Sequence, residues 1–290
     1  MIVLDRTQWR EQNLLMVSLI WHQRAVPLYW QFLPHKGSSS FTEQRAIVQT
    51  ILPLLKNYQV TVLGDREFCS VELGQWLGNQ DLLLCLRLRR NEYIHSAHEI
   101  TRQLSQVGLA PGTSLFFEGV NVTRQQGFGS FNVACKWKRN YRKKVLSEGW
   151  FLLTNLPTLQ AATIAYQQCS GIEAMFKDCK SGGYSLEGCH ANQQRLCAIV
   201  LLIALAYSSA IIQGLEIQTL QVEHYVCRPK EPSRTCRRHS HFWVGLYSQT
   251  WLSTLDLCTD WVAQWICFNR NKRLYYQRGL RAIALMQPQL

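Results

Sequence analysis

Three acidic side chains that lie far apart in the sequence could together perform metal-dependent chemistry. Asp5 ends a short apolar run, "MIVLD", Asp65 ends a β-branched run, "VTVLGD", and Glu173 lies inside a segment with helical spacing. Side chains at the carboxyl ends of neighbouring strands of an open sheet converge on one crevice. If the two runs form neighbouring strands, Asp5 and Asp65 face each other, and a helix packed across the sheet can add Glu173.

Three carboxylates with open coordination positions are hard oxygen ligands of the kind that Mg²⁺ or Mn²⁺ prefers. Two such ions, about 3.5–4 Å apart, hold both the attacking and the leaving oxygen of an in-line phosphoryl displacement. The three residues are therefore candidates for both the catalytic and the metal-binding role, with two Mg²⁺ or Mn²⁺ ions as the cofactor.

The segment 158–181 is expected to be one helix, and its geometry can be worked out from about 100° of rotation per residue. Four positions fall within about 60° of one another; they are Tyr166, Cys169, Glu173 and Lys180. Four more lie beside them as the expected buried stripe; they are Ala165, Ile172, Phe176 and Cys179. Spacing alone favours a solvated helix in which Glu173 and Lys177 form an ordinary i,i+4 pair.

The first ninety residues show a regular alternation of strand and helix signals. Strands are expected at 1–7, 14–21, 24–33, 58–65 and 81–90, and helices at 38–56 and 68–79. The two strands at 14–21 and 24–33 are separated by two residues, which predicts a β-hairpin. The predicted order is therefore β, β, β, α, β, α, β, which indicates an α/β fold.

The region from 91 to 150 is expected to be a β-rich insertion. Residues 131–138 alternate strictly between apolar and polar, which predicts a half-buried strand with 114–123 as its partner. The run "KWKRNYRKK", 136–144, has six basic residues in nine. Such a run suits either a solvated surface or, with Trp137 interleaved, a DNA backbone and a stacked base. Its candidate DNA-binding residues are Lys136, Trp137, Lys138, Arg139 and Arg142.

The chain becomes helical after a last strand at 150–156. Helices are expected at 191–213, 250–268 and 272–285, with a short strand at 242–248. The apolar stretch 196–212 is 17 residues long, at the short limit for a membrane span, so a buried core helix is the preferred interpretation and no membrane partner is expected.

The net charge and the cysteine content indicate the class of binding partner and the cellular compartment. The chain has 31 Lys and Arg against 19 Asp and Glu, a net charge of +12, which favours a polyanion such as nucleic acid. The eleven cysteines are scattered without a C-x-x-C pair, which favours reduced thiols and a cytoplasmic protein, associated with the nucleoid when bound to DNA. Cys227, Cys236, His239 and His241 form a loose cluster whose spacing fits no common zinc module.

The segment "YQQCSGIEAMFKDCK" resembles the Y-x2-R-x3-E-x6-K motif of DDE transposases of the insertion-sequence-four family. Tyr166, Glu173 and Lys180 keep both long spacings, and "SGGYSLEG" directly after them is also similar. The segments "VLDRTQW" and "VLGDREF" look like the family's first and second aspartate segments, with Asp5 and Asp65. The resemblance extends from residue 1 to about residue 255.

The resemblance implies a ribonuclease H-like mixed sheet flanked by helices and interrupted by a β-rich insertion. The implied parts are the first part of the core (1–90), the insertion (91–150), the second part with the catalytic helix (151–215) and a C-terminal helical region (216–290). Asp5, Asp65 and Glu173 would be a DDE triad binding two metals. Tyr166, Lys180 and Arg66 would contact DNA, and an insertion tryptophan, Trp137 or Trp150, would hold a flipped base.

The implied activity is cleavage and strand transfer of an insertion sequence, with transposon ends and target DNA as partners and a homodimer as the assembly. Two features depart from the family. Cys169 stands where the family has an arginine, and a thiol cannot replace a bidentate phosphate ligand. Asp5 lies five residues from the start, whereas family members carry an upstream helical region, which predicts an N-terminally truncated copy. The alternatives are a catalytically impaired remnant that still binds DNA and a nuclease of the same fold without strand transfer.

Overall fold

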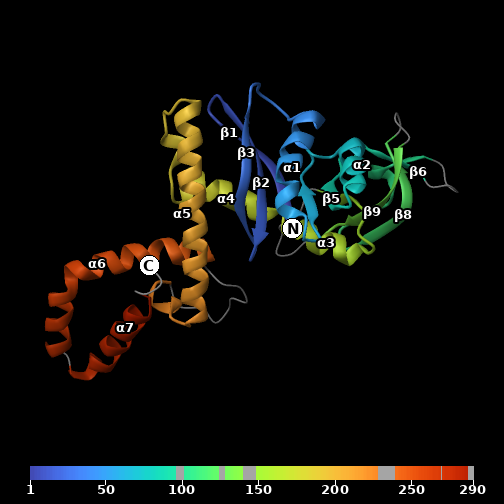
Figure 1. Cartoon of the computed structure of the whole chain (residues 1–290). Helices are drawn as coiled ribbons and strands as arrows, with labels where there is room; N and C mark the ends of the chain where they lie inside the picture. The colour runs from blue at the N-terminus through green and yellow to red at the C-terminus, as the bar shows by residue number, and fades with distance from the viewer. Residues whose placement is uncertain (96–100, 124–127, 140–147, 228–238, 269, 287–290) are drawn as a thin grey trace. The chain divides into compact units, whose positions relative to one another are not determined.

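A computed structural model describes residues 1–95, 101–123, 128–139, 148–227, 239–268 and 270–286 (Figure 1). The chain divides into two units, Met1–Gln194 and Arg195–Leu290. The fold is mixed α/β, with a ten-stranded mixed sheet flanked by helices. The four-part domain division and the ribonuclease H-like topology stay predictions.

The sheet of the first unit has the strand order β3-β2-β1-β4-β5-β10-β9-β8-β6-β7. Its strands are β1 (Ile2–Trp9), β2 (Gln12–Trp21), β3 (Arg24–Leu33), β4 (Thr61–Gly64), β5 (Leu83–Arg87), β6 (Tyr93–His95), β7 (Arg102–Gln103), β8 (Ser114–Val122), β9 (Phe128–Lys136) and β10 (Trp150–Thr154). The pairs β1–β4 and β4–β5 are parallel, and the other pairs are antiparallel. The predicted order of the first seven elements is confirmed.

The hairpin of β2 and β3 forms as predicted because its two-residue loop has the backbone that such loops need. His22 and Gln23 both have positive φ, at 47° and 64°. Two successive positive φ values give a turn whose twist matches that of the flanking strands. The hairpin pairs with β1 and continues the sheet to its β3 edge.

Two helices follow the hairpin and cover part of the sheet. The predicted serine start of α1 (Phe41–Leu55) is a capping box: the Ser40 side chain accepts from the Glu43 N–H, and Glu43 accepts from the Ser40 N–H. Ser70 caps α2 (Val71–Asn79) by accepting from the Leu73 N–H. Helix α1 buries Ile47, among others, in the same hydrophobic core as the strands.

The predicted pairing of 114–123 with 131–138 is confirmed as β8–β9, but the expectation of a half-buried strand is wrong. Phe131, Val133 and Cys135 are buried as predicted, and Ala134 on the opposite face is fully buried as well. Helix α2 lies against β9 at Phe131, where Gly74 approaches the ring, and helix α3 (Leu159–Gln167) also packs on β9. Strand β9 is therefore covered by a helix on each face.

The single helix expected at 158–181 is broken into three parts. Helix α3 is followed by α4 (Ser170–Lys177) and by η2 (Asp178–Gly182), a π-helical turn. At the break, the N–H groups of Gln168 and Cys169 bond the carbonyls of Ala165 and Tyr166, three residues back. These i→i−3 bonds tighten the chain to a 3₁₀ turn, which changes the rotation per residue. The predicted buried stripe is nevertheless confirmed, since all four of its residues are buried.

The second unit is helical, with α5 (Gln193–Thr219), α6 (His241–Phe268) and α7 (Arg273–Met286). The strand expected at 242–248 is wrong, because these residues form the start of α6. Gly214 of α5 and Gly245 of α6 let the two backbones approach too closely for any larger side chain. By length and composition α5 could cross a membrane, and 44% of its apolar window is buried. The choice between a core helix and a membrane span stays a prediction.

Candidate active site

Strands β1 and β4 bring Asp5 and Asp65 to adjacent positions. The two strands are parallel neighbours, paired at Ile2↔Val62, Val3↔Leu63 and Leu4↔Gly64. Asp5 and Asp65 are the next residues on each strand in the same direction, where side chains converge. The expectation that Asp5 ends its strand is wrong: β1 continues to Trp9 because it stays paired with β2 beyond the end of the parallel ladder. Asp5 therefore lies on a continuous strand, which fixes its backbone.

Glu173 is carried by α4, which packs on the hairpin of β2 and β3. Gly171 lies close to the hairpin turn, where a β-carbon would come within 3.2 Å of the Gln23 carbonyl oxygen. The Arg24 Nη1 donates to Asp178 Oδ2 at 2.9 Å, which ties the end of α4 to the start of β3. These two contacts set the position of α4 against the sheet, and Glu173 itself is exposed to solvent.

The three carboxylates are close enough to affect one another electrostatically. Burial raises the pKa of Asp5 to about 7; the Arg6 backbone N–H opposes this, and the carboxylates of Asp65, Glu173 and Glu67 raise it further. Burial is also the largest cause of the raised pKa of Asp65, which the Glu67 N–H opposes. A carboxyl group with a pKa near 7 is unfavourable in its charged form, so the site favours a proton or a cation at Asp5.

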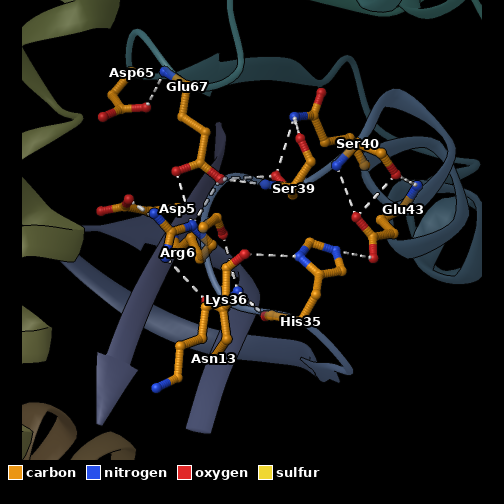
Figure 2. Close-up of polar contacts among 12 residues, drawn as sticks. Asp5, Arg6, Asn13, His35, Lys36, Ser39, Ser40, Glu43, Asp65 and Glu67 are labelled. Carbon is orange, nitrogen blue, oxygen red and sulfur yellow. Dashed lines mark hydrogen bonds and ion pairs between the residues drawn. The ribbon is translucent and has the colours of Figure 1, made fainter. Parts of the chain in front are cut away.

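Glu67 organises the surroundings of both aspartates, and sequence reasoning missed it. Figure 2 shows Arg6 Nε donating to both carboxylate oxygens of Glu67, each at 2.8 Å. The Ser39 backbone N–H and hydroxyl both donate to Glu67 Oε1 at 2.9 Å. Arg6 Nη1 also donates to Asn13 Oδ1 at 2.9 Å. This network joins β1, β2, the loop before α1 and the loop after β4.

The same network holds the loop that carries Asp65. The Glu67 N–H donates to Asp65 Oδ1 at 2.8 Å, and the Arg6 N–H donates to Asp5 Oδ1 at 2.7 Å (Figure 2). Each aspartate is thus held by a backbone N–H from a residue of the Arg6–Glu67 ion pair. In the sequence, the signal for this arrangement is that Arg6 directly follows Asp5 and that Glu67 lies two residues after Asp65.

Tyr166 and Cys169 lie buried beside the carboxylates rather than on an open face. Each is 7% exposed. Burial is the largest cause of the raised pKa of Cys169, followed by the charges of Asp5, Asp65 and Glu173. Cys169 is therefore near all three acids, and burial keeps it a neutral thiol. The helical spacing predicts that position 169 lies beside Glu173, and the effect of the Glu173 charge on the Cys169 pKa is consistent with this.

Tyr166 connects the carboxylates to a group of arginines and aromatic rings. Burial raises its pKa, and the nearby Arg87 side chain opposes this rise. Its ring meets that of Trp150 edge-on, with centroids 5.1 Å apart, and Lys138 Nζ lies 4.7 Å from the centre of the Trp150 ring. Of the two candidate tryptophans, Trp150 is the one placed against Tyr166.

The remaining predicted DNA-binding residues are spread along the first unit. Lys180 is half-exposed in η2, Lys136 is half-exposed at the end of β9, and Arg139 is exposed near Gly112. Arg142 and Cys236 lie outside the described residues. Arg66 forms an ion pair with Glu148, as does Arg87 at 2.9 Å. The sequence reasoning did not identify Arg87 or Glu148.

The donor set of the site fits a hard divalent cation by its chemistry, since it consists of carboxylate oxygens that repel one another. In the described ranges, however, no three His, Cys, Asp or Glu side chains are arranged so that they could hold a metal ion.

Comparison with known proteins assigns no family. No family model matches the chain, and no curated protein matches its sequence. Among solved structures, the chain is similar to a piggyBac transposase in a synaptic complex with hairpin DNA, with 13% sequence identity and a TM-score of 0.46. The match covers 97% of this chain and 57% of that one, so the chain spans little more than half of the structure it matches.

Proposed function

We propose that this protein is a DDE transposase of an insertion sequence, with Asp5, Asp65 and Glu173 as its catalytic carboxylates. The observation that carries the proposal is the parallel pairing of β1 with β4, which puts Asp5 beside Asp65 in a fold where α4 adds Glu173. The spacing of Tyr166, Glu173 and Lys180 in the family motif supports the same assignment.

The reaction proceeds in two phosphoryl transfers. A water oxygen attacks a phosphorus atom of the transposon end, the bond to the 3′ oxygen breaks, and that oxygen takes a proton to become a free 3′-hydroxyl. The 3′-hydroxyl then attacks a phosphorus atom of the target DNA and displaces its 3′ oxygen. Two Mg²⁺ or Mn²⁺ ions held by Asp5, Asp65 and Glu173 would supply activation of the attacking oxygen and offset charge on the leaving oxygen.

The other residues bind and orient the DNA. Tyr166, Lys180 and Arg66 contact backbone phosphates near the scissile bond, which fixes the register of the DNA without reading its sequence. The basic residues Lys136, Lys138 and Arg139 extend this contact along the backbone, and Trp150 stacks on an unpaired base. With its pKa raised to about 7, the Asp5 carboxyl of the metal-free site is partly protonated near neutral pH, and binding of a cation would release that proton.

Metal-dependent nicking of DNA tests the proposal. The substrate is a supercoiled plasmid that carries the gene with its flanking DNA, incubated with Mn²⁺ and purified protein. We expect nicked product from the native protein, loss of at least about 100-fold with Glu173→Gln, and no loss with Glu72→Gln, an exposed acid on α2. Nicking that persists at the native rate in Glu173→Gln would overturn the assignment.

A joining assay on the same DNA separates strand transfer from simple cleavage. Product in which the freed 3′ end is joined to a second DNA supports a transposase. Cleavage without any joined product would identify the chain as a nuclease of the same kind.

A catalytically impaired DNA-binding remnant is the second candidate, and Cys169 favours it. The buried thiol lies near the three acids, where the family motif has a guanidinium. If this reading holds, the native protein binds DNA without nicking it, and Cys169→Arg restores nicking. Cys169→Ser serves as the control, because it changes the side chain without adding a charge.

A further inference from the structure

Two arginines converge on one carboxylate oxygen beside the proposed catalytic site. Arg66 Nη2 and Arg87 Nη2 both pair with Glu148 Oε1, the latter at 2.9 Å. Arg66 follows β4, Arg87 ends β5, and Glu148 precedes β10. These three strands are consecutive in the sheet, so the site is built on the backbone of adjacent strands.

The charges of this group do not balance. Two guanidinium groups, those of Arg66 and Arg87, pair with the single carboxylate of Glu148. A guanidinium fork binds a phosphate as well as a carboxylate, because both present oxygens in a similar plane. A phosphodiester carries the same single negative charge as Glu148 and offers two oxygens to the two arginines.

The position of the group connects it to the proposed chemistry. Arg66 directly follows Asp65, and the Arg87 side chain is close enough to Tyr166 to affect its pKa. The side chains of Arg87 and Glu148 are 22% and 24% exposed, and that of Arg66 is 41% exposed, so solvent reaches the group. A phosphate of DNA bound near Asp65 could therefore reach both arginines if Glu148 moved away.

We propose that Glu148 occupies, in the DNA-free protein, a phosphate site formed by Arg66 and Arg87, and that a DNA phosphate displaces it. The inference rests on the proposed function, because it takes the ligand to be a DNA backbone. Glu148 then acts as an internal competitor for the phosphate site. Displacing it costs every DNA the same binding free energy, so a DNA that makes many other contacts is favoured over one that makes few.

Inorganic phosphate tests the arginine site without any DNA. Binding is measured by the shift in thermal midpoint as phosphate is added at constant ionic strength. We expect Glu148→Gln to bind phosphate about two- to tenfold more tightly than the native protein. Glu118→Gln, which removes one exposed acid from β8, is the matched control for net charge and should bind as the native protein does. Adding Arg87→Gln to Glu148→Gln should remove the gain.

The second arm repeats the comparison with a fluorescent duplex DNA in metal-free buffer. Glu148→Gln should bind the duplex about two- to tenfold more tightly than Glu118→Gln does, and Arg87→Gln should again remove the difference. Equal affinities of the two glutamine variants for phosphate would overturn the proposal. Tighter phosphate binding with unchanged DNA affinity would also overturn it, because DNA would then not use the site. Neither result depends on nicking, so a failure here leaves the test with Glu173→Gln intact.

Discussion

Two neighbouring regions of the first unit have an excess of charge of opposite sign. The carboxylate region is formed by Asp5, Asp65, Glu67 and Glu173. Among the ion pairs of the described residues, only Glu67 of this region has a cation as partner, Arg6, whereas the aspartates accept backbone N–H bonds. In the arginine region, formed by Arg66, Arg87 and Glu148, two cations share one acid. The first region has an excess of negative charge and the second an excess of positive charge. A metal-bound phosphodiester would complement both at once.

The comparison also predicts different roles for the two paired acids. Glu67 and Arg6 are 13% and 18% exposed, and Glu67 also accepts two hydrogen bonds from Ser39. Glu67 is therefore expected to act mainly in stability, whereas the more exposed Glu148 is expected to act mainly in ligand binding.

Removal of Glu67 should have the largest effect on stability. Glu67→Ala leaves the Arg6 guanidinium and the Ser39 donors without their acceptor, and we expect a loss of about 3 kcal/mol in the free energy of unfolding. Urea denaturation at pH 7 measures it. The control is Lys36→Ala, which breaks the exposed pair with Glu11 and should cost under about 0.5 kcal/mol. Similar losses in the two variants would contradict a structural role for Glu67.

Asp5→Asn should stabilise the metal-free protein, and more so at high pH. The pKa of Asp5 is raised to about 7 in the folded protein, so between pH 4 and 7 the folded state holds a proton that the unfolded state has lost. The native protein therefore loses stability as pH rises through this range, and the asparagine variant lacks the contribution of Asp5 to that loss. The gain from the substitution should grow by on the order of 2 kcal/mol between pH 5 and pH 8.

Thermal unfolding in buffers that contain a chelator checks this pH dependence. Mg²⁺ added at pH 8 should raise the midpoint of the native protein and raise that of Asp5→Asn less, because a cation offsets the same repulsion that the substitution removes. A gain that is constant from pH 5 to pH 8 would show that Asp5 titrates normally and that the carboxylate region carries no unusual charge.

Glu148→Gln should change the free energy of unfolding by about 1 kcal/mol or less, a smaller change than that expected for Glu67→Ala. The pair is partly exposed, so solvent screens it, and the amide oxygen of glutamine can still accept from Arg87. The same urea denaturation measures it. A loss as large as that of Glu67→Ala would mean that Glu148 is a structural residue and not a displaceable one.

The fold was predictable where the sequence pattern is local. The hairpin, the capped helices and the alternating strand all depend on residues within a few positions of one another. The break between α3 and α4 was not predictable, because it depends on i→i−3 bonds at Gln168 and Cys169, residues that also fit a continuous helix. The start of α6 at His241 was missed because aromatic and β-branched residues favour strands until packing against another helix decides.

Within the candidate site, the adjacency of Asp5 and Asp65 was predictable from the sequence. Asp5 and Asp65 each follow an apolar run in the sequence, and this is a local signal. Arg87 and Glu148 are 61 residues apart, and nothing local in the sequence pairs them; they meet only because β5 and β10 are neighbours in the sheet. Glu67 was missed for a related reason, since its partner Arg6 is also 61 residues away. Charge pairs across a sheet become visible once the strand order is known.

Substitution of Lys138 should have the smallest effect on the free energy of unfolding. Its effect on DNA binding should show where the arginine region ends. Its ammonium group lies over the Trp150 ring, and an exposed contact of this kind contributes about 0.5 kcal/mol. Lys138→Met keeps the aliphatic stem, so stability should fall by that amount or less. If Lys138 also contacts a DNA phosphate, the slope of log affinity against log salt should fall by about one unit.

The salt dependence of duplex binding therefore decides between two roles for Lys138. A lower slope would place it with Arg66 and Arg87 in one continuous phosphate-binding surface that ends at the Trp150 ring. An unchanged slope with slightly lower stability would mean that Lys138 only supports the edge-on contact of Trp150 with Tyr166. In that case the excess positive charge that faces the carboxylate region belongs to Arg66 and Arg87, and the effect of Glu148→Gln on DNA affinity should be the same whether or not Lys138 is present.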